Sequence, residues 1–160
     1  MAHTHAHGFK DDEDALAAVE EHHGHMLERV TALSDALLAA VEAGDGGAAY
    51  DEKANLVGWC EDELIPHALA EEGPLYGPAR ETPEARLLVE GMLQDHQAIV
   101  GLVEELRDAD GARAAAVGLA IARAFALHLR KENGLLFPFM VENPDLSLAQ
   151  AVEGLEEVVG

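Results

Sequence analysis

Two stretches of the sequence decide the fold: HALAEEGPLYGP at residues 67–78 and HLRKENGLLFP at residues 128–138. Each begins with a His and has a Glu four residues later, followed by Gly, apolar residues and Pro. Because side chains four residues apart share one face of a helix, both stretches predict a helical turn that presents an imidazole and a carboxylate. With nine His in 160 residues, roughly one such pair is expected by chance, so the matching flanks carry the signal.

The rest of the chain contains a weaker repeat. Counting from His23 and from His96, apolar residues follow at offsets 3, 4, 7 and 10 in both cases. We therefore expect two similar helical hairpins, with His23 opposite His96 and the two His-x-x-x-Glu turns opposite each other. The first helix also offers His22 and His25. The matched offsets favour His23, and the choice among the three stays open.

Apolar residues at three- and four-residue steps predict four long helices and a short fifth one. The first helix ends at Gly44-Asp45-Gly46-Gly47, and the second runs through Leu56 to His67 and stops at Gly73-Pro74. The third opens at Thr82-Pro83, with a capping hydroxyl before the Pro, and stops near Asp110-Gly111. The fourth carries Val117 to Leu136 and ends around Pro138 or shortly after, and the fifth spans Ser147 to Val159 with a Ser cap. Pro66 is expected to kink the second helix just before His67.

Helices of comparable length joined by short loops bury their apolar stripes by antiparallel packing. The expected fold is all-α: an up-down-up-down antiparallel four-helix bundle with a short C-terminal accessory helix. The bundle is assigned to residues 15–141 and the accessory helix to residues 142–160. Residues 1–14 are expected to form a flexible, His-containing N-terminus.

Charge and composition exclude several classes of partner. The chain has 10 Lys and Arg against 31 Asp and Glu, and its net charge of -21 repels nucleic acid and anionic membrane surfaces. The apolar stretch from Ala114 to Leu129 is interrupted by Arg123 and His128, and no run approaches the roughly 20 residues of a membrane span. A single Cys and the absence of a secretory signal fit a reducing compartment. We expect a cytoplasmic protein with no nucleic-acid partner and no membrane association.

The repeated His and Glu residues point to a metal. His128 and Glu132 continue the core-facing stripe of the fourth helix, where an unpaired carboxylate is costly to bury and a cation removes that cost. Imidazole and carboxylate together suit Fe, Mn or Zn. The candidate ligands are His23, His67, Glu71, His96, His128 and Glu132. If both Glu residues bridge two cations, the protein supplies about eight of about twelve coordination bonds, and solvent, an oxo bridge or substrate fills the rest.

Two further residues are candidates for contact with these ligands. Glu63, one turn before His67, is either an additional group at the site or a partly exposed surface residue. Tyr76 either donates a hydrogen bond to a bound oxygen species or is ordinary core together with Trp59 and Phe137.

The set His23, His67 with Glu71, His96, and His128 with Glu132 resembles the metal-binding pattern of the hemerythrin-like family, also called HHE cation-binding domains. The resemblance covers roughly residues 15–141. It implies a four-helix bundle that holds a non-haem di-iron centre with bridging carboxylates. The expected cofactor is therefore two iron ions with a bridging oxo or hydroxo group, and Mn or Zn are alternative metals. It also implies oxygen binding, oxygen or iron sensing, nitric oxide handling or peroxide chemistry.

One position departs from the family pattern. Oxygen-carrying hemerythrins have a second His one turn after the ligand of the third helix, and Val100 occupies that position here. Fewer protein ligands leave more exchangeable positions on the metal. This arrangement suits reaction with peroxide or nitric oxide at least as well as reversible oxygen carriage.

The sequence supports three functional hypotheses. The first is a di-iron protein that binds or reacts with oxygen, nitric oxide or peroxide; turnover as a peroxide- or nitric-oxide-consuming oxidoreductase stays open, and no catalytic residue is assigned. The second is an oxygen, nitric oxide or iron sensor that acts through an unidentified protein partner, with the fifth helix as the moving or partner-binding element. The third is a metal-free helical interaction module. A ferritin-like site is disfavoured because it needs Glu-x-x-His on two helices, and this spacing occurs only at Glu20 and His23.

Overall fold

The computed structural model describes residues 11–159, and within this range the chain is helical and contains no strand. The elements are α1 (Asp12–Glu42), α2 (Gly46–Trp59), the π-helical turn η1 (Cys60–Leu64), α3 (Ile65–Glu71), α4 (Tyr76–Arg80), α5 (Pro83–Asp108), α6 (Gly111–Lys131), the π-helical turn η2 (Glu132–Leu136), α7 (Phe137–Glu142) and α8 (Leu148–Val159). The all-α expectation is confirmed. Residues 1–10 of the expected flexible N-terminus lie outside the described residues, and residues 12–14 belong to α1.

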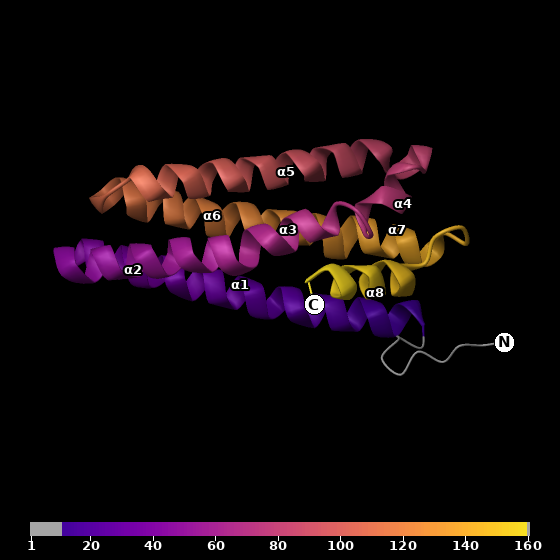
Figure 1. Cartoon of the computed structure of the whole chain (residues 1–160), viewed down its shortest axis with the longest axis horizontal. Helices are drawn as coiled ribbons and strands as arrows, with labels where there is room; N and C mark the ends of the chain where they lie inside the picture. The colour runs from indigo at the N-terminus through magenta and orange to yellow at the C-terminus, as the bar shows by residue number, and fades with distance from the viewer. Residues whose placement is uncertain (1–10, 160) are drawn as a thin grey trace.

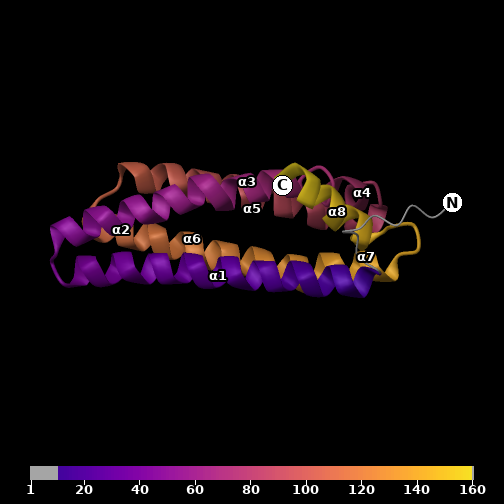
Figure 2. The same ribbon diagram turned by 60° about the horizontal axis from the view of Figure 1, so that its bottom comes forward.

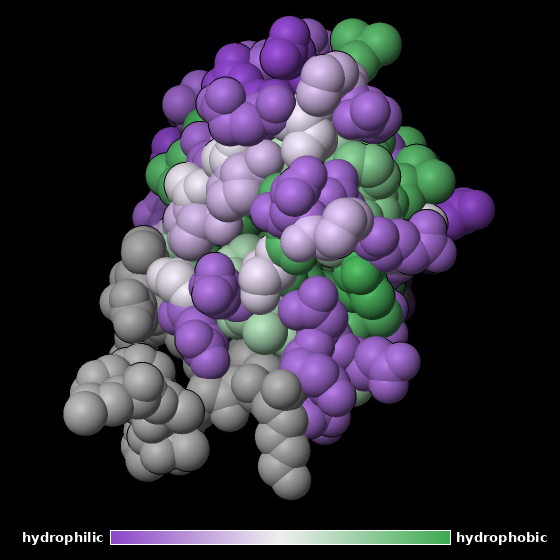
Figure 3. All heavy atoms as spheres, turned by 90° about the vertical axis from the view of Figure 1, so that its right-hand side faces the viewer, coloured by the Kyte–Doolittle hydropathy of each residue, from purple (hydrophilic) through white to green (hydrophobic). Residues whose placement is uncertain are grey.

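The molecule is an elongated helical bundle (Figure 1). The helix α1, the segment α2–η1–α3, the helix α5 and the segment α6–η2–α7 lie along its long axis, while α4 and α8 lie at the end where α1 begins (Figures 1 and 2). The helix α6 contacts both α1 and α5, and α8 packs on α1 and α3. At the end that carries α4, α7 and α8, Figure 3 shows mostly hydrophilic side chains with hydrophobic ones between them.

Two helix starts illustrate how local sequence sets the boundaries. Gly44 adopts a positive φ of 70° after α1, and the side chain of Asp45 then accepts a backbone hydrogen bond from the first turn of α2. Thr82 and Pro83 open α5 as expected. The Thr82 hydroxyl does not cap α5, however, because it donates to the Ala79 carbonyl at 2.6 Å. That bond ties α5 back to α4, a short helix that the sequence patterns did not predict.

Both segments that contain an internal Pro pass through it and continue as helices. Pro66 is in the first turn of α3 and Pro138 is in the first turn of α7, and a π-helical turn directly precedes each of these helices. In a regular α-helix the Pro ring would clash with the carbonyl four residues earlier, and the wider π turn relieves this clash. The irregularity expected before His67 therefore takes the form of a widened turn, and the helical segment extends past Pro138 to Glu142.

Two apolar clusters fill the bundle, one on each side of a polar layer. The first includes Val30, Leu56, Ile99, Ile121 and Phe125. The second includes Val19, Tyr76, Met92, Leu136 and Phe137. Buried polar side chains interrupt the apolar stripes between the clusters, at position 23 of α1, position 96 of α5 and positions 128 and 132 of α6–η2. Because buried polar groups are costly without partners, this layer is the candidate functional site.

The segment from Gly111 to Glu142 forms one 32-residue helix that is long and apolar enough to cross a membrane, and half of its most apolar window is buried inside the molecule. Its buried face carries His128 and Glu132, and it packs on α1 and α5. Burial within the bundle accounts for the apolar composition of this segment.

Candidate metal centre

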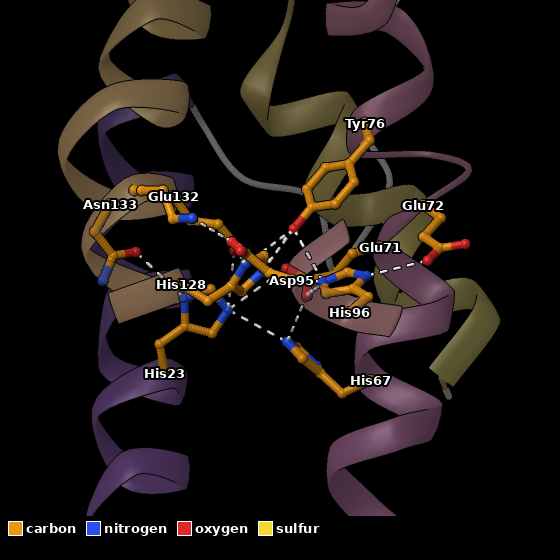
Figure 4. Close-up of polar contacts among 11 residues, drawn as sticks. His23, His67, Glu71, Glu72, Tyr76, Asp95, His96, His128, Glu132 and Asn133 are labelled. Carbon is orange, nitrogen blue, oxygen red and sulfur yellow. Dashed lines mark hydrogen bonds and ion pairs between the residues drawn. The ribbon is translucent and has the colours of Figure 1, made fainter. Parts of the chain in front are cut away.

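The six predicted ligand side chains come together in the polar layer (Figure 4). They come from α1, α3, α5, α6 and the π turn η2. All six are at most 5% exposed: His23, His67, Glu71, His96, His128 and Glu132. The choice left open among the three His of α1 is narrowed by burial, because His22 and His25 are exposed.

The imidazoles form two pairs whose Nε2 atoms face each other. In the His96–His128 pair the two Nε2 atoms are 3.0 Å apart, and in the His23–His67 pair they are 3.2 Å apart. Two nitrogens that bind one ion at right angles, with bonds of about 2.1 Å, lie about 3.0 Å from each other. Each pair therefore has the spacing of neighbouring ligands on an octahedral metal ion.

The two carboxylates lie between the pairs. Glu132 Oε1 is 2.5 Å from His128 Nε2, and Glu132 Oε2 is 3.7 Å from His23 Nε2. Glu71 Oε1 likewise lies 3.6 Å from the Nε2 atom of the His four residues before it and 3.8 Å from His96 Nε2. Each Glu thus lies within 4 Å of an imidazole from each pair, and Glu132 lies much closer to His128 than to His23.

The donor atoms fit two cations. Glu71 Oε2 and Glu132 Oε2 are buried and have no hydrogen-bond donor. Such oxygens are costly unless a positive partner is present. Donor atoms within 4.8 Å of one another form two groups that share Glu71: one contains Glu71, His96, His128 and Glu132, and the other contains His23, His67 and Glu71. The arrangement is therefore suited to two metal positions joined by a carboxylate.

The outer nitrogens of three imidazoles donate hydrogen bonds to acceptors around the centre. These bonds run from His96 Nδ1 to Glu72 Oε1 (3.1 Å), from His128 Nδ1 to Asp95 Oδ2 (2.9 Å) and from His23 Nδ1 to Asn133 Oδ1 (3.2 Å). Carboxylate and amide oxygens only accept, so each Nδ1 carries the hydrogen. In the neutral form of each ring, Nε2 is therefore left with a lone pair directed at the centre, the state that a metal ligand needs.

Burial holds most of these imidazoles neutral. It lowers the pKa of His23 and His96, and it lowers the pKa of His67 to about 3. His128 differs: burial acts in the same direction, but the hydrogen bonds and charges of Glu132 and Asp95 outweigh it and raise its pKa. Metal binding requires the neutral imidazole, so three of the four are already in the binding form at neutral pH.

The two central carboxyl groups are shifted in opposite directions. Burial and the charge of Glu132 raise the pKa of Glu71. Burial also disfavours ionisation of Glu132, but the hydrogen bond from His128 and the charge of His23 outweigh it and lower the pKa of Glu132. Without a cation, the pair is therefore expected to carry one carboxylate and one carboxylic acid.

Tyr76 lies against the His96–His128 pair (Figure 4). Its side chain is 1% exposed, and its Oη donates to Glu132 Oε1 at 2.7 Å and lies 2.9 Å from His128 Nε2. Burial and the two nearby carboxylates raise its pKa, so the phenol keeps its proton. The ring of Tyr76 is thus part of the core, and its hydroxyl group lies at the centre.

Glu63 is exposed on η1, and the described residues show no polar contact between it and the centre. The π turn inserts extra backbone before His67, so a residue four positions earlier no longer shares its face. Of the two alternatives that the sequence left for Glu63, the structure therefore supports the surface residue and not the additional group at the site. Cys60, in the same turn, is buried, and burial raises the pKa of its thiol to about 12.

The sequence analysis did not identify the acceptors of the imidazole hydrogen bonds, which are Glu72, Asp95 and Asn133. It offered His22 only as an alternative ligand, and the structure places its ring centroid 5.2 Å from that of His67. Glu72 and Asn133 each follow a ligand Glu, and His22 and Asp95 each precede a ligand His. The repeat could have identified these residues, because the sequence neighbours of repeated ligands lie at equivalent positions around the centre.

A helical bundle that buries two groups of His and Glu side chains able to hold a metal ion defines a class of helical metal-binding protein. A scan against family models matches the hemerythrin HHE cation-binding domain over residues 14–140. The chain belongs to this family, and the resemblance predicted over residues 15–141 is confirmed. Searches of curated proteins and of solved structures give no match.

Proposed function

We propose that the centre holds two iron ions and that this di-iron site binds or reacts with a small ligand: oxygen, nitric oxide or peroxide. The observation that carries the proposal is the placement of two imidazole pairs around two carboxylates whose Oε2 atoms have no donor. In this proposal the His96–His128 pair with Glu132 holds one ion, the His23–His67 pair holds the other, and Glu71 contacts both. Bound iron supplies redox chemistry and exchangeable positions for a small ligand.

The surrounding side chains support a small ligand. Six protein side chains leave part of the roughly twelve coordination positions of two ions to solvent or ligand. The Phe137 ring stacks on His23 with 6.0 Å between ring centroids and covers one face of that imidazole. Tyr76 holds a proton 2.7 Å from Glu132 Oε1 and offers a donor to a polar ligand. Val100, where oxygen-carrying hemerythrins have a further His, favours reaction with peroxide or nitric oxide over stable oxygen transport.

A groove on the surface leads to one side of the centre. It has a volume of about 540 Å³, lies between α1 and α6, and is lined by residues that include His23, Gly24, Arg130, Asn133 and Gly134. Gly24 and Gly134 leave open space where a Cβ would lie. A diatomic molecule or peroxide therefore has a short route to His23.

Elemental analysis with visible absorption spectra, before and after exposure to oxygen, tests the metal part of the proposal. The wild-type chain is expected to contain two Fe per chain and to change its spectrum with oxygen. His128→Ala is expected to lose iron, whereas His25→Ala, which removes an exposed His of α1, is expected to match the wild type. Absence of bound metal after reconstitution with Fe, Mn and Zn would contradict the proposal and leave a metal-free helical interaction module.

Peroxide consumption tests whether the centre turns over. If the protein is an oxidoreductase, the iron-loaded wild type consumes hydrogen peroxide catalytically and His128→Ala does not. Equal rates in the two proteins would contradict an enzymatic role for this site. Binding of azide or nitric oxide without turnover would support the ligand-binding function.

A second candidate function, a sensor that acts through a protein partner, is favoured by the position of α8. This helix packs on α3, and Gly154 lies so close to Pro74 that an added Cβ would be 2.9 Å from the Pro74 Cβ. Pro74 lies two residues before Tyr76, so a change at the centre has a short path to α8. Hydrogen exchange of α8 is expected to change when nitric oxide is added to the iron-loaded protein, and unchanged exchange would count against a sensor.

We further infer that the four long helical segments follow an up-down-up-down order. We also infer a cytoplasmic location without nucleic-acid or membrane partners. The short connection between α1 and α2 and that between α5 and α6 support the helix order. The net charge of -21 supports the absence of anionic partners. Binding assays with duplex DNA and anionic vesicles check the second point, and saturable binding would contradict it.

A further inference from the structure

The centre has a twofold repeat whose two sides carry different charges. When His67 is matched with His128 and His23 with His96, the surrounding residues also match in pairs: Glu72 with Asn133, Asp95 with His22, and Tyr76 with Phe137. Each matched residue occupies the equivalent place, because Glu72 accepts from His96 as Asn133 accepts from His23. The repeat therefore allows the two metal positions to be compared residue by residue.

The His96–His128 side is surrounded by acidic acceptors. His96 donates to the Glu72 carboxylate at 3.1 Å, and His128 donates to the Asp95 carboxylate at 2.9 Å. Lys131 offsets part of the Asp95 charge, because its Nζ lies 2.5 Å from Asp95 Oδ2. Glu72 is thus the acidic acceptor whose charge acts most directly on this side (Figure 4).

The His23–His67 side has no carboxylate in the equivalent places. His23 donates to the amide oxygen of Asn133 at 3.2 Å. The place that corresponds to Asp95 is taken by His22, whose ring lies 5.2 Å from that of His67. This side therefore has the neutral amide of Asn133 and a third imidazole, that of His22, where the other side has two carboxylates.

We propose that Glu72 and Asn133 make the two metal positions unequal, so that the His96–His128 position binds metal more tightly and fills first. This inference rests on the proposed di-metal function and deepens it. An anionic acceptor on Nδ1–H makes the imidazole a stronger donor at Nε2, and such outer partners typically change metal affinity 10–100-fold. The donor groups point the same way: the His96–His128 group has four ligand side chains with two carboxylates, and the His23–His67 group has three with one.

A zinc titration of the metal-free, full-length protein labelled with 15N-histidine tests this order. Zn²⁺ is diamagnetic, so the ring resonances of each His report its own binding, and single His→Gln variants at positions 23, 67, 96 and 128 assign them. With the first equivalent of Zn²⁺, the resonances of His96 and His128 are expected to reach their bound positions. Those of His23 and His67 are expected to follow with the second equivalent.

Two variants of unchanged shape test the residues. Glu72→Gln is expected to weaken the first binding step 10–100-fold and bring it towards the second, and Asn133→Asp is expected to tighten the second step by a similar factor. Glu63→Gln, which changes an exposed Glu on η1, is the control and is expected to leave both steps unchanged.

The outcomes separate the two proposals. If both His pairs shift in parallel and neither Glu72→Gln nor Asn133→Asp alters the isotherm, the inequality is overturned while the di-metal function stands. If the His23–His67 pair fills first, the assignment of the tighter position is overturned. If no imidazole shifts with any amount of zinc, and iron and manganese also fail to bind, the proposed function falls and the inequality falls with it.

Discussion

The two His-x-x-x-Glu turns reach the same centre along different backbones. After Glu71 the chain leaves the helix at residues 72–75 and begins α4, whereas after Glu132 it stays helical through η2 into α7. Nonetheless Tyr76 and Phe137, each nine residues after its His, stack on equivalent imidazoles. The Tyr76–His96 ring centroids are 5.4 Å apart and the Phe137–His23 centroids are 6.0 Å apart. The repeat therefore preserves the place of side chains at the centre and tolerates different backbone paths between them.

Removing the Phe137 ring is expected to have the largest effect on stability. The side chain is fully buried, and Phe→Ala in a core costs about 3–5 kcal/mol of unfolding free energy. Leu135→Ala, two residues earlier and 55% exposed, is the control and is expected to change stability by less than about 0.5 kcal/mol. Urea unfolding of the metal-free proteins measures both. A cost below about 1 kcal/mol for Phe137→Ala would mean that the two sides are not supported by equivalent aromatic rings.

The hydroxyl of Tyr76 distinguishes the two aromatic positions, and substitutions that remove it or add one at position 137 test its contribution to stability. Tyr76→Phe removes the 2.7 Å bond to Glu132 and is expected to cost about 1.5–3 kcal/mol, because the acceptor is charged and buried. Phe137→Tyr adds an oxygen atom to a fully buried ring and is expected to be destabilising, because the packed core leaves no room for it. Urea unfolding of both variants checks this; equal effects would show that the hydroxyl bond is not specific to the Tyr76 side.

The two ligand carboxyl groups, Glu71 and Glu132, also differ, because the pKa of Glu71 is raised and that of Glu132 is lowered. The raised pKa of Glu71 means that the folded, metal-free chain binds more protons than the unfolded chain between the ordinary pKa of 4.5 and the raised value. Its stability is therefore expected to fall as pH rises through that window, by up to about 1.4 kcal/mol per pH unit. Glu71→Gln cannot ionise, so the variant is expected to be more stable than the wild type without metal, by a margin that grows with pH.

Unfolding curves of the two metal-free proteins between pH 5 and pH 8 measure this margin, since the contributions of the histidines are common to both. The same substitution is expected to reduce metal content, because it removes the ligand shared by both positions. A Glu71→Gln protein that is less stable than the wild type at every pH would show that the carboxyl group is satisfied without metal.

The features that repeat could be predicted from the sequence, and the features that break the repeat could not. The six candidate ligands follow from matched spacing, and burial then favoured His23 among its neighbours. Spacing fails where the backbone departs from a regular α-helix: η1 turns Glu63 away from the face of His67. The turn after Glu71 and the helix α4 also escaped prediction, because Gly73 and Pro74 signal the end of a helix without specifying the next element. Glu72 and Asn133 follow ligands in the sequence, but their role as acceptors could not be predicted because the imidazoles that donate to them lie on other helices.

The smallest expected effect concerns α8, which packs on α3 and, less extensively, on α7. Pro74 lies under Gly154 of α8, whereas the equivalent residue of the second turn, Leu135, is 55% exposed. Gly154→Ala gains about 0.5–1 kcal/mol of helix propensity but forces its Cβ to 2.9 Å from Pro74 Cβ, so a net cost of about 1 kcal/mol is expected. Gly134→Ala, with open space around the new Cβ, is the control and is expected to be neutral or slightly stabilising. Thermal unfolding of the two variants measures the difference. If both were equally stabilising, α8 would not be held against the first turn, and the path from the centre to α8 would lose its support.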